Sequence, residues 1–340
     1  MLPNLISPFH LLLTFKESRI SRNMKSIFAR SLFKSYDEIN AVDGIDLDID
    51  DGQIFGFLGP NGAGKSTVIK LLTTLIQPTS GKISVLEIDT AKEPLNIRKK
   101  IGVVLQQPSY EPTLSVEKSL EKYGMMWNLD KKTRMDRTEE LLTSFNLVEI
   151  RKKKNEDLSI GQRRRVQVAR EFMHDMDLLF LDEPTVGLDP TTRRQLLDFL
   201  KNKVKEKNLT IFYTTHVLTE AEYLCDNIAI INKGRIITID SPNELKKRFG
   251  SEKTIKIHIS SNTEALESLL ENVKDCKIEF NTGATITIHS TDSELVLMNI
   301  LKILNQNNIT IDDLTAIPTN LEEIFLKVVS DSNASDNQTS

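Results

Sequence analysis

Short apolar runs and longer amphipathic stretches alternate along the first 250 residues of this 340-residue chain. The runs "QIFGFL", "IGVVLQ", "DLLFLDEP" and "TIFYTTH" have the length and apolar content of buried parallel strands. The stretches "STVIKLLTTLI", "SVEKSLEKYGMMWNL" and "RMDRTEELLTSFNL" have helical spacing, and Pro78 and Gly81 mark the end of the first helix. This order of elements predicts an α/β fold.

The pattern changes after residue 250. Strand patterns in "TIKIHIS", "KIEF", "ATITIHS" and "ITIDDLTAI" are interleaved with helical patterns in "NTEALESLLENV" and "SELVLMNILKILNQNN". The resulting β-α-β-β-α-β order predicts a small α+β ferredoxin-like domain over residues 251–330. Net charge supports the boundary, since it is about +4 before Gly250 and about −8 after it. A last helix, "NLEEIFLKVV", precedes a polar tail at residues 331–340 that is predicted to be disordered.

Composition narrows the class of protein. With 39% hydrophobic and 27% charged residues, the chain can bury a core, which excludes a wholly disordered protein. A net charge of −4 gives no indication of nucleic-acid binding. Cys225 and Cys276 are far apart and are predicted to be buried, reduced thiols. No apolar run approaches the roughly 20 residues of a membrane span. Residues 1–24 are expected to be an N-terminal extension, either a loose tail or the result of a start assigned to Met1 instead of Met24.

The segment "GPNGAGKST" carries the most specific chemistry. It fits G-x-x-x-x-G-K-[ST] and lies between a predicted strand and a predicted helix, an order that argues against an accidental glycine-rich turn. Glycines let backbone N–H groups approach phosphates at the positive end of the helix. Lys65 is expected to reach the β- and γ-phosphates, and the Ser66 hydroxyl to bind Mg²⁺. The predicted phosphate-binding residues are Gly59, Pro60, Asn61, Gly62, Ala63, Gly64, Lys65, Ser66 and Thr67.

Two carboxylates end the strand "DLLFLDEP". Ligands bind at the carboxyl ends of parallel strands, so these acids are expected to face the same phosphates. Asp182 is predicted to hold Mg²⁺ through water, and Glu183 to polarise the water that attacks the γ-phosphate. The alternative is that the acids only cap the next helix. Together, the two motifs indicate a P-loop NTPase that uses ATP and Mg²⁺.

Further motifs follow in a fixed order: Gln106 at a strand end, "LSIGQ" after some fifty residues of helical pattern, "VGLDP", and His216 after "TIFYTT". With them, residues 25–250 resemble the ATP-binding subunit of an ABC transporter. The resemblance implies a RecA-like core with a helical subdomain at about residues 107–175. The part of the chain after residue 250, together with the segment "TTHVLTEAEYLCDNIAIINKG" that precedes it, is similar to the ATPases of ABC-2 exporters of the daunorubicin-resistance group.

The resemblance assigns further roles. Tyr36 matches the aromatic residue that stacks on adenine, although it could be an ordinary buried tyrosine. Gln106 matches the residue that contacts Mg²⁺ and links the nucleotide to the membrane partner. His216 matches the histidine that bonds the γ-phosphate, which makes it catalytic together with Glu183 and Gln106. Asp189 matches a residue that communicates across a dimer. The signature residues expected to close on ATP held by a second subunit are Ser159, Gly161 and Gln162.

Ile160 departs from the family pattern, which has glycine there. A β-branched residue is strained at positive φ, so the loop must be right-handed at this point. The side chain is then expected to point back into the helical domain, and the site to remain active. The arginines that follow, Arg163 to Arg165, are expected to lie on the solvated face of a helix.

The resemblance therefore implies an ATP-hydrolysing subunit that drives a separate transmembrane permease. It implies a homodimer, no nucleic-acid partner, and a cytoplasmic location at the inner face of the membrane. One alternative is a soluble ABC ATPase that acts on ribosomes or nucleic acid, but such proteins usually carry two cassettes or a long coiled-coil insertion. Another is a module that binds ATP without hydrolysis, which Glu183 and His216 oppose. The transported substrate is not encoded in this chain.

Overall fold

The computed structural model describes residues 24–107, 109–249, 253–260, 269–270, 273, 276–281, 285–290, 293–317 and 321–336. The predicted N-terminal extension, apart from Met24, lies outside the described residues. The chain divides into two compact units, Met1–Ile239 and Asp240–Ser340. This division precedes the change of pattern near residue 250, so helix α9 (Pro242–Phe249) belongs to the second unit.

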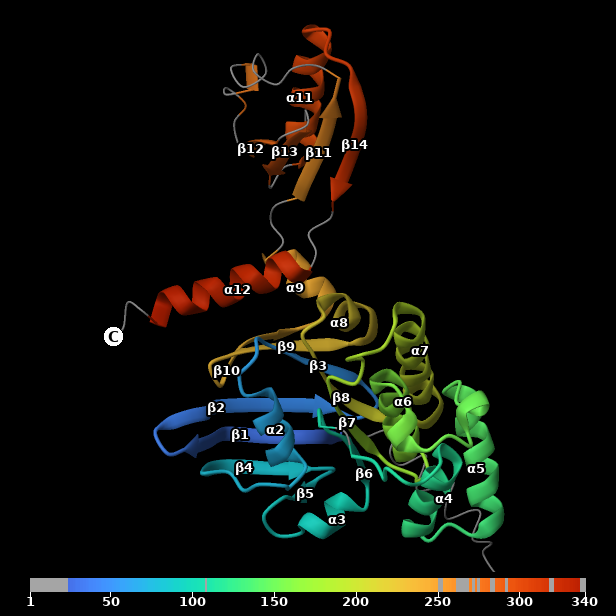
Figure 1. Ribbon diagram of the computed structural model, residues 1–340. Coiled ribbons are helices and arrows are strands. Elements are labelled where there is room, and N and C mark those ends of the chain that lie inside the picture. The colour runs from blue at the N-terminus through green and yellow to red at the C-terminus, as the bar shows by residue number, and fades with distance from the viewer. Residues whose placement is uncertain are drawn as a thin grey trace, which may run out of the picture. The chain divides into compact units, whose positions relative to one another are not determined.

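A six-stranded sheet forms the centre of the first unit (Figure 1). Its strands lie in the order β10-β9-β3-β8-β7-β6, and β3, β6, β7, β8 and β9 pair in parallel. Every residue of β3, β7 and β8 is buried, which explains why these strands read as continuous apolar runs. The α/β fold is confirmed. The bounds are β3 Ile54–Leu58, β6 Ile101–Val104, β7 Leu178–Asp182, β8 Thr210–Thr215, β9 Asn227–Asn232 and β10 Arg235–Asp240.

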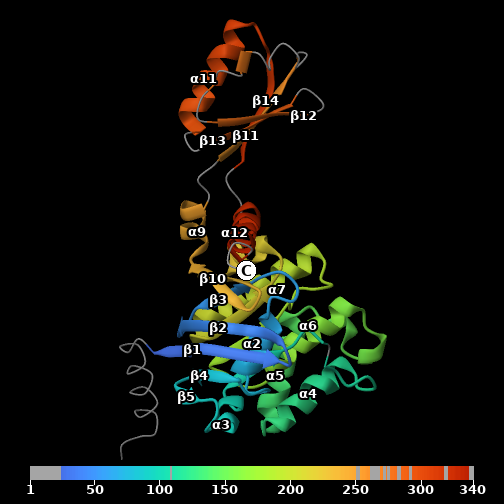
Figure 2. The ribbon, with the colours of Figure 1, turned by 90° about the vertical axis from the view of Figure 1, so that its left-hand side faces the viewer.

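A second, antiparallel sheet has the order β2-β1-β4-β5. Helix α2 (Lys65–Leu72) contacts β2 and β4 of this sheet and β7 of the other, so it joins both sheets into one core (Figure 2). The helix is shorter than the sequence suggests. Thr73 Oγ1 donates to the Ile69 carbonyl and Thr74 takes φ 61°, which ends the helix before Pro78. The other bounds are β1 Lys25–Tyr36, β2 Ile39–Asp50, β4 Ser80–Val85, β5 Ile88–Asp89 and α3 Pro94–Arg98.

Between β6 and β7 the chain forms the expected helical segment. Helices α4 and α5 pack on each other, and α4 also packs on α6. The ring of Trp127, just after α4, stacks on that of His174 with centroids 3.8 Å apart and connects α4 to the segment after α6. The bounds are α4 Val116–Met126, α5 Lys131–Ser144, α6 Ile160–Glu171, α7 Pro190–Lys207 and α8 Leu218–Leu224, with short 3₁₀ turns at Val148–Ile150 and Asn155–Asp157.

The second unit contains the predicted α+β domain. Its four-stranded sheet has the order β12-β13-β11-β14 with antiparallel pairs, so the first strand lies between the third and the fourth, as in a ferredoxin-like fold. The predicted helix "NTEALESLLENV" lies almost wholly outside the described residues. Helix α12 continues to Asp336, into the segment expected to be a disordered tail. The bounds are β11 Lys253–Ile259, β12 Cys276–Asn281, β13 Thr285–Ser290, α11 Ser293–Gln306, β14 Ile311–Ile317 and α12 Leu321–Asp336.

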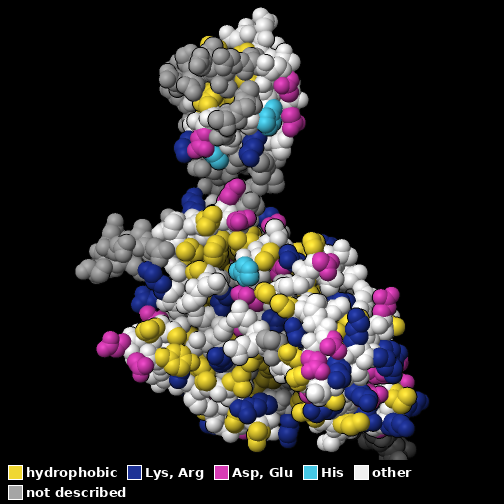
Figure 3. Space-filling model, viewed as in Figure 1, with side chains coloured by type: hydrophobic (Ala, Val, Ile, Leu, Met, Phe, Trp, Pro, Cys, Tyr) yellow, Lys and Arg dark blue, Asp and Glu magenta, His cyan; other side chains and the backbone are white. Residues whose placement is uncertain are grey.

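Three general features of the described residues bear on function. None of their helices combines the length and apolar character needed to cross a membrane. On the face in Figure 3, basic and acidic side chains are interspersed over the first unit. Both cysteines are free thiols; Cys225 is buried and Cys276 is half-buried. Burial raises the pKa of the Cys225 thiol.

Candidate active site

The loop between β3 and α2 wraps around the start of the helix. Gly64 caps α2 in the left-handed region at φ 106°, and a Cβ there would lie 2.4 Å from the Ala41 carbonyl oxygen. Gly59 approaches the Ile231 carbonyl just as closely. Only glycine fits at these two positions, so the backbone can present its N–H groups at the positive end of α2.

Lys65 is the first residue of α2, and its side chain folds back over the loop. Its Nζ donates to the carbonyl oxygens of Gly59 at 2.7 Å and Pro60 at 3.1 Å. The residue is buried, which lowers the pKa of its ammonium group; the carboxylates of Glu183 and Asp182 act in the opposite direction. The two carbonyl hydrogen bonds therefore hold the ammonium group at the loop.

A cavity of about 320 Å³ opens at this loop. It brings together residues from four separate segments: the loop and start of α2, Ala41 of β2, Gln106 after β6, and Glu183 after β7. Parallel strands end at the same edge of the sheet, and this edge is where the polar side chains meet. The predicted phosphate-binding residues that line it are Asn61, Gly62, Gly64, Lys65, Ser66 and Thr67.

The acid pair lies where the sequence predicts, at the end of β7. Asp182 is buried and accepts from Ser66 Oγ at 2.9 Å and from Thr214 Oγ1 at 2.6 Å. Glu183 points one oxygen at Gln106 Nε2 (3.4 Å) and the other at His216 Nδ1 (3.2 Å). Glutamine, glutamate and histidine from three strand ends therefore converge at the edge of the cavity.

Glu183 has an unusual backbone, with φ 48°. A non-glycine residue in the left-handed region costs about 1 kcal/mol or more and needs surrounding support. The Glu183 N–H donates to the carbonyl and the hydroxyl of Thr214, both at 3.1 Å. Its carbonyl accepts from Arg164 Nη2 at 3.0 Å. Hydrogen bonds on both sides of the residue thus hold its strained conformation.

Arg164 is a functional candidate that the sequence reasoning missed. It was expected on a solvated helix face, but it is buried, and its guanidinium also donates to the carbonyls of Asp182 and Leu105. Burial lowers its pKa, with Asp182 and Glu183 opposing this. Its neighbours are half-buried: Arg163 donates to Tyr110 Oη and Arg165 to the Phe145 carbonyl. Arg164 therefore ties the helix that follows the signature to the acid pair.

The signature residues lie outside this cavity, on the surface of the helical segment. Ser159 caps α6 by accepting from the Gln162 N–H, and the Gln162 side chain accepts from the Ser159 N–H in return. This reciprocal capping box fixes the start of the helix. Gly161 packs closely against the backbone of the turn before α7. A Cβ on this residue would lie only 2.5 Å from the Gly187 carbonyl oxygen, so there is no room for a side chain.

Ile160 is the first residue of α6, so its backbone is right-handed as predicted. The expected direction of its side chain is wrong. Instead of packing into the helical domain, Ile160 is 67% exposed, and its side chain lies beside Gly187. The side chains of a first helical turn point back toward the helix start, and here the start of the helix faces solvent.

The exposure of Ile160 sets the expected cost of removing it. Ile160→Gly should lower the free energy of unfolding by only about 0.5–1 kcal/mol, mainly through added backbone freedom. ATPase activity should stay within a few-fold of the parent, because the Ile160 N–H remains. Thermal denaturation and phosphate release measure both quantities. A tenfold higher rate would instead make Ile160 a brake on the reaction.

Tyr36 and Asp189 also lie outside the cavity. Tyr36 ends β1 with 45% of its surface exposed and with Lys34 Nζ 5.1 Å from its ring centre, so it is not an ordinary buried tyrosine. Asp189 caps α7 by accepting from the Thr192 N–H at 3.0 Å, and hydrogen bonds from Thr192 lower the pKa of its carboxyl. Both side chains are accessible to an added molecule.

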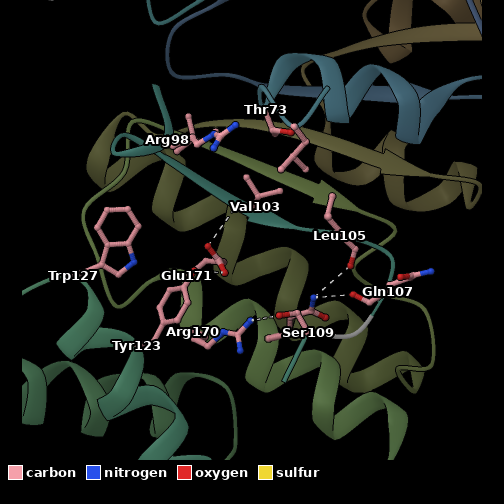
Figure 4. Close-up of a pocket in the computed structure, with 13 residues that line it drawn as sticks. Thr73, Arg98, Val103, Leu105, Gln107, Ser109, Tyr123, Trp127, Arg170 and Glu171 are labelled. Atoms are coloured by element: carbon pink, nitrogen blue, oxygen red, sulfur yellow. Dashed lines mark hydrogen bonds between the residues drawn. The ribbon is translucent and has the colours of Figure 1, made fainter. Parts of the chain in front are cut away.

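A second cavity, of about 520 Å³, lies next to the Gln106 segment (Figure 4). Leu105 and Gln107 line one side, and Tyr123 and Trp127 of the α4 segment line another. Glu171 accepts from Tyr123 Oη at 2.9 Å and from the Val103 N–H at 3.2 Å, and burial raises the pKa of its carboxyl. The cavity thus offers aromatic and charged groups close to the predicted nucleotide contact.

Comparisons with known proteins agree with this geometry. Residues 42–186 match the family described as ABC transporter, and residues 241–329 match the C-terminal domain of DrrA1-3-like ATP-binding proteins. The linearmycin resistance ATP-binding protein LnrL of Bacillus subtilis (strain 168) is 35% identical over 88% of this chain and 97% of its own length. The daunorubicin/doxorubicin resistance ATP-binding protein DrrA of Streptomyces peucetius is 34% identical over 89% of this chain and 92% of its own length. A solved ATP-binding cassette, a dimer in a post-hydrolysis state with bound ADP and Pi, is 27% identical over 63% of this chain and 98% of its own, with a TM-score of 0.60.

Proposed function

The chain belongs to the ATP-binding subunits of ABC transporters, as an ATPase of the exporter type, and we propose that it works as a pair of subunits joined to a separate membrane permease. The observation that carries the proposal is that Lys65 and Glu183 line one cavity at the phosphate loop, with His216 Nδ1 3.2 Å from the Glu183 carboxylate. A cation for the phosphates and a carboxylate for the attacking water are then held within one site.

In this proposal the phosphates of ATP lie along the loop and the start of α2, and Lys65 contacts the β- and γ-phosphates. The Glu183 carboxylate accepts a hydrogen bond from Gln106, and its other oxygen faces His216. These contacts hold the carboxylate at the edge of the cavity, where it orients and polarises water. His216 donates to the γ-phosphate. Tyr36, half exposed beyond the cavity, stacks on adenine.

The oxygen atoms near Ser66 suit Mg²⁺. The Ser66 hydroxyl and the Asp182 carboxylate lie 2.9 Å apart, and hard oxygen ligands of this kind are those that Mg²⁺ takes, together with substrate phosphates. Among the described residues, no group of three or more His, Cys, Asp or Glu could hold a metal ion by itself. Ser66, Asp182 and Gln106 would therefore hold Mg²⁺ with the nucleotide; when bound, it neutralises charge on the phosphates.

The position of the signature supports a pair of subunits. Ser159 is exposed, Gly161 and Gln162 are half-buried, and none of them lines the cavity of its own chain, so in this proposal they close on ATP held by a second copy. The solved cassette with 27% identity is a dimer. Asp189, exposed at the start of α7, lies one short turn from the signature and would contact the second copy too.

The cavity beside Leu105 and Gln107 supports a permease contact. It lies next to Gln106, which reaches Glu183, so a segment bound there would be connected to the catalytic carboxylate. We propose that a cytoplasmic segment of the permease binds this cavity and holds the subunit at the inner face of the membrane. A ribosome-associated or nucleic-acid-associated ATPase is the less favoured alternative, because relatives that match this chain over more than nine-tenths of their own length, at 97% and 92%, are resistance proteins.

Replacing Lys65 by alanine tests the proposal. Without the ammonium group on the β- and γ-phosphates, affinity for ATP should fall at least about tenfold, and hydrolysis should fall with it. Lys70→Ala is the matched control, because Lys70 lies on the same helix but is exposed. Titration with a fluorescent ATP analogue gives the affinity. Equal affinities for parent and Lys65→Ala would mean that the phosphates bind elsewhere.

A further inference from the structure

Glu220, on helix α8, is a buried acid for which the proposed reaction has no direct use. One of its carboxylate oxygens accepts three hydroxyl groups: Tyr213 Oη at 2.7 Å, Thr185 Oγ1 at 2.9 Å and Thr215 Oγ1 at 3.0 Å. A buried carboxylate is stable only when hydrogen bonds and opposite charge replace its water. This cluster of hydroxyls supplies the hydrogen bonds.

The other oxygen of Glu220 faces Arg193, with Nε 3.2 Å away in an ion pair. The two atoms are not aligned as a hydrogen bond, and neither has another hydrogen-bond partner among the described residues. Arg193 lies in the first turn of α7, where its N–H donates to the Asp189 carbonyl. The ion pair therefore connects Glu220 to the start of α7.

The partners of Glu220 are neighbours of proposed site residues. Thr215 directly precedes His216, and its hydroxyl also accepts from the Val217 N–H at 2.9 Å. Thr185 follows Glu183 by two positions, and its carbonyl accepts from the Leu188 N–H in the turn that leads to Asp189. One buried oxygen thus contacts the segments on which the histidine, the glutamate and the aspartate lie.

We infer that Glu220 is a positioning residue, which holds the His216 end of β8 and the Thr185–Leu188 turn in register with Glu183. This inference rests on the proposed function of the site. Charge-assisted hydrogen bonds are shorter and stronger than neutral ones, and a single acceptor shared by two segments fixes their relative position. The register matters because His216 Nδ1 lies 3.2 Å from Glu183, a contact that a small shift of β8 would break.

Glu220→Gln tests the inference, because it keeps the shape of the side chain while removing its charge. The kcat for ATP should fall at least tenfold, with the KM for ATP within twofold of the parent, since Lys65 and the phosphate loop are untouched. Glu222→Gln, on the same helix, is the matched control and should keep kcat within twofold. ATP hydrolysis by the full chain and thermal denaturation are measured for each variant.

A second pair of variants separates positioning from stability. Thr215→Val and Tyr213→Phe each remove one hydroxyl from the same oxygen of Glu220, but only Thr215 adjoins a proposed site residue. Thr215→Val should lower kcat at least fivefold, whereas Tyr213→Phe should lower the melting temperature and keep kcat within twofold. If both variants change kcat equally, or if neither does, Glu220 has only a structural role.

The outcomes also separate this inference from the proposed function. A parent chain that binds no ATP and releases no phosphate contradicts the proposed function itself. An active parent with an equally active Glu220→Gln variant contradicts the positioning role alone. A Glu220→Gln variant whose KM rises while kcat stays constant also overturns it, because the residue would then act on binding.

Discussion

Glu183→Gln is expected to lower ATP turnover at least about 10²-fold while ATP binding persists. The amide keeps the size of the side chain and one oxygen that can face Gln106 or His216, so the cavity should keep its shape. It loses the negative charge that polarises water, and general-base catalysis typically contributes 10²–10⁴-fold. The strained backbone of Glu183 should be unaffected, because its supports are the backbone contacts with Thr214 and Arg164.

Phosphate release and nucleotide titration measure the two halves of this prediction. Because ATP should bind without being consumed, the variant should also accumulate as an ATP-bound dimer, which light scattering detects as a doubled mass. Glu206→Gln, at an exposed position of α7, controls for loss of an acidic residue. Near-normal turnover by Glu183→Gln would show that another group activates the water.

The parts of the fold that the sequence predicts well are those fixed by local pattern. Strands β3, β7 and β8 read as apolar runs because every residue in them is buried. The phosphate loop is equally readable, because Gly59 and Gly64 are required by close backbone approach. The order of the remaining motifs implied the family, which the relatives then confirmed.

The features that could not be predicted depend on contacts between distant segments. Arg164 looks like part of a solvated basic run, yet its guanidinium reaches carbonyls at the end of β7. Nothing in the letters around Glu183 indicates a positive φ, because that conformation is imposed by Thr214 and Arg164. The right-handed backbone at Ile160 predicts a side chain that points back into the helical domain, but the first turn of α6 faces away from the core and leaves Ile160 exposed. In each case, contacts with distant segments determine the burial or the backbone conformation of the residue, and its type alone does not predict them.

Gly161→Asp is the second change expected to have a large effect. In the proposed pair of subunits, Gly161 faces the γ-phosphate held by the other copy, so a carboxylate there would oppose it. Like charges about 4 Å apart repel by about 4 kcal/mol at an effective dielectric of about 20, which corresponds to roughly 10³-fold. Dimer closure and turnover should therefore collapse, while ATP binding at Lys65 of the same subunit persists.

Because Gly161 lies so close to Gly187, a second variant is needed to separate the effect of the charge from the effect of the added side chain. Any Cβ at residue 161 would lie 2.5 Å from the Gly187 carbonyl oxygen, so Gly161→Ala must also displace the turn before Asp189. Alanine measures this steric effect alone, and aspartate adds the charge. We expect Gly161→Ala to lower turnover by a smaller factor and Gly161→Asp to be at least tenfold slower than the alanine variant, with both binding ATP normally. Equal rates for the two variants would mean that Gly161 acts only through the Gly187 turn, because a phosphate facing residue 161 would distinguish a carboxylate from a methyl group.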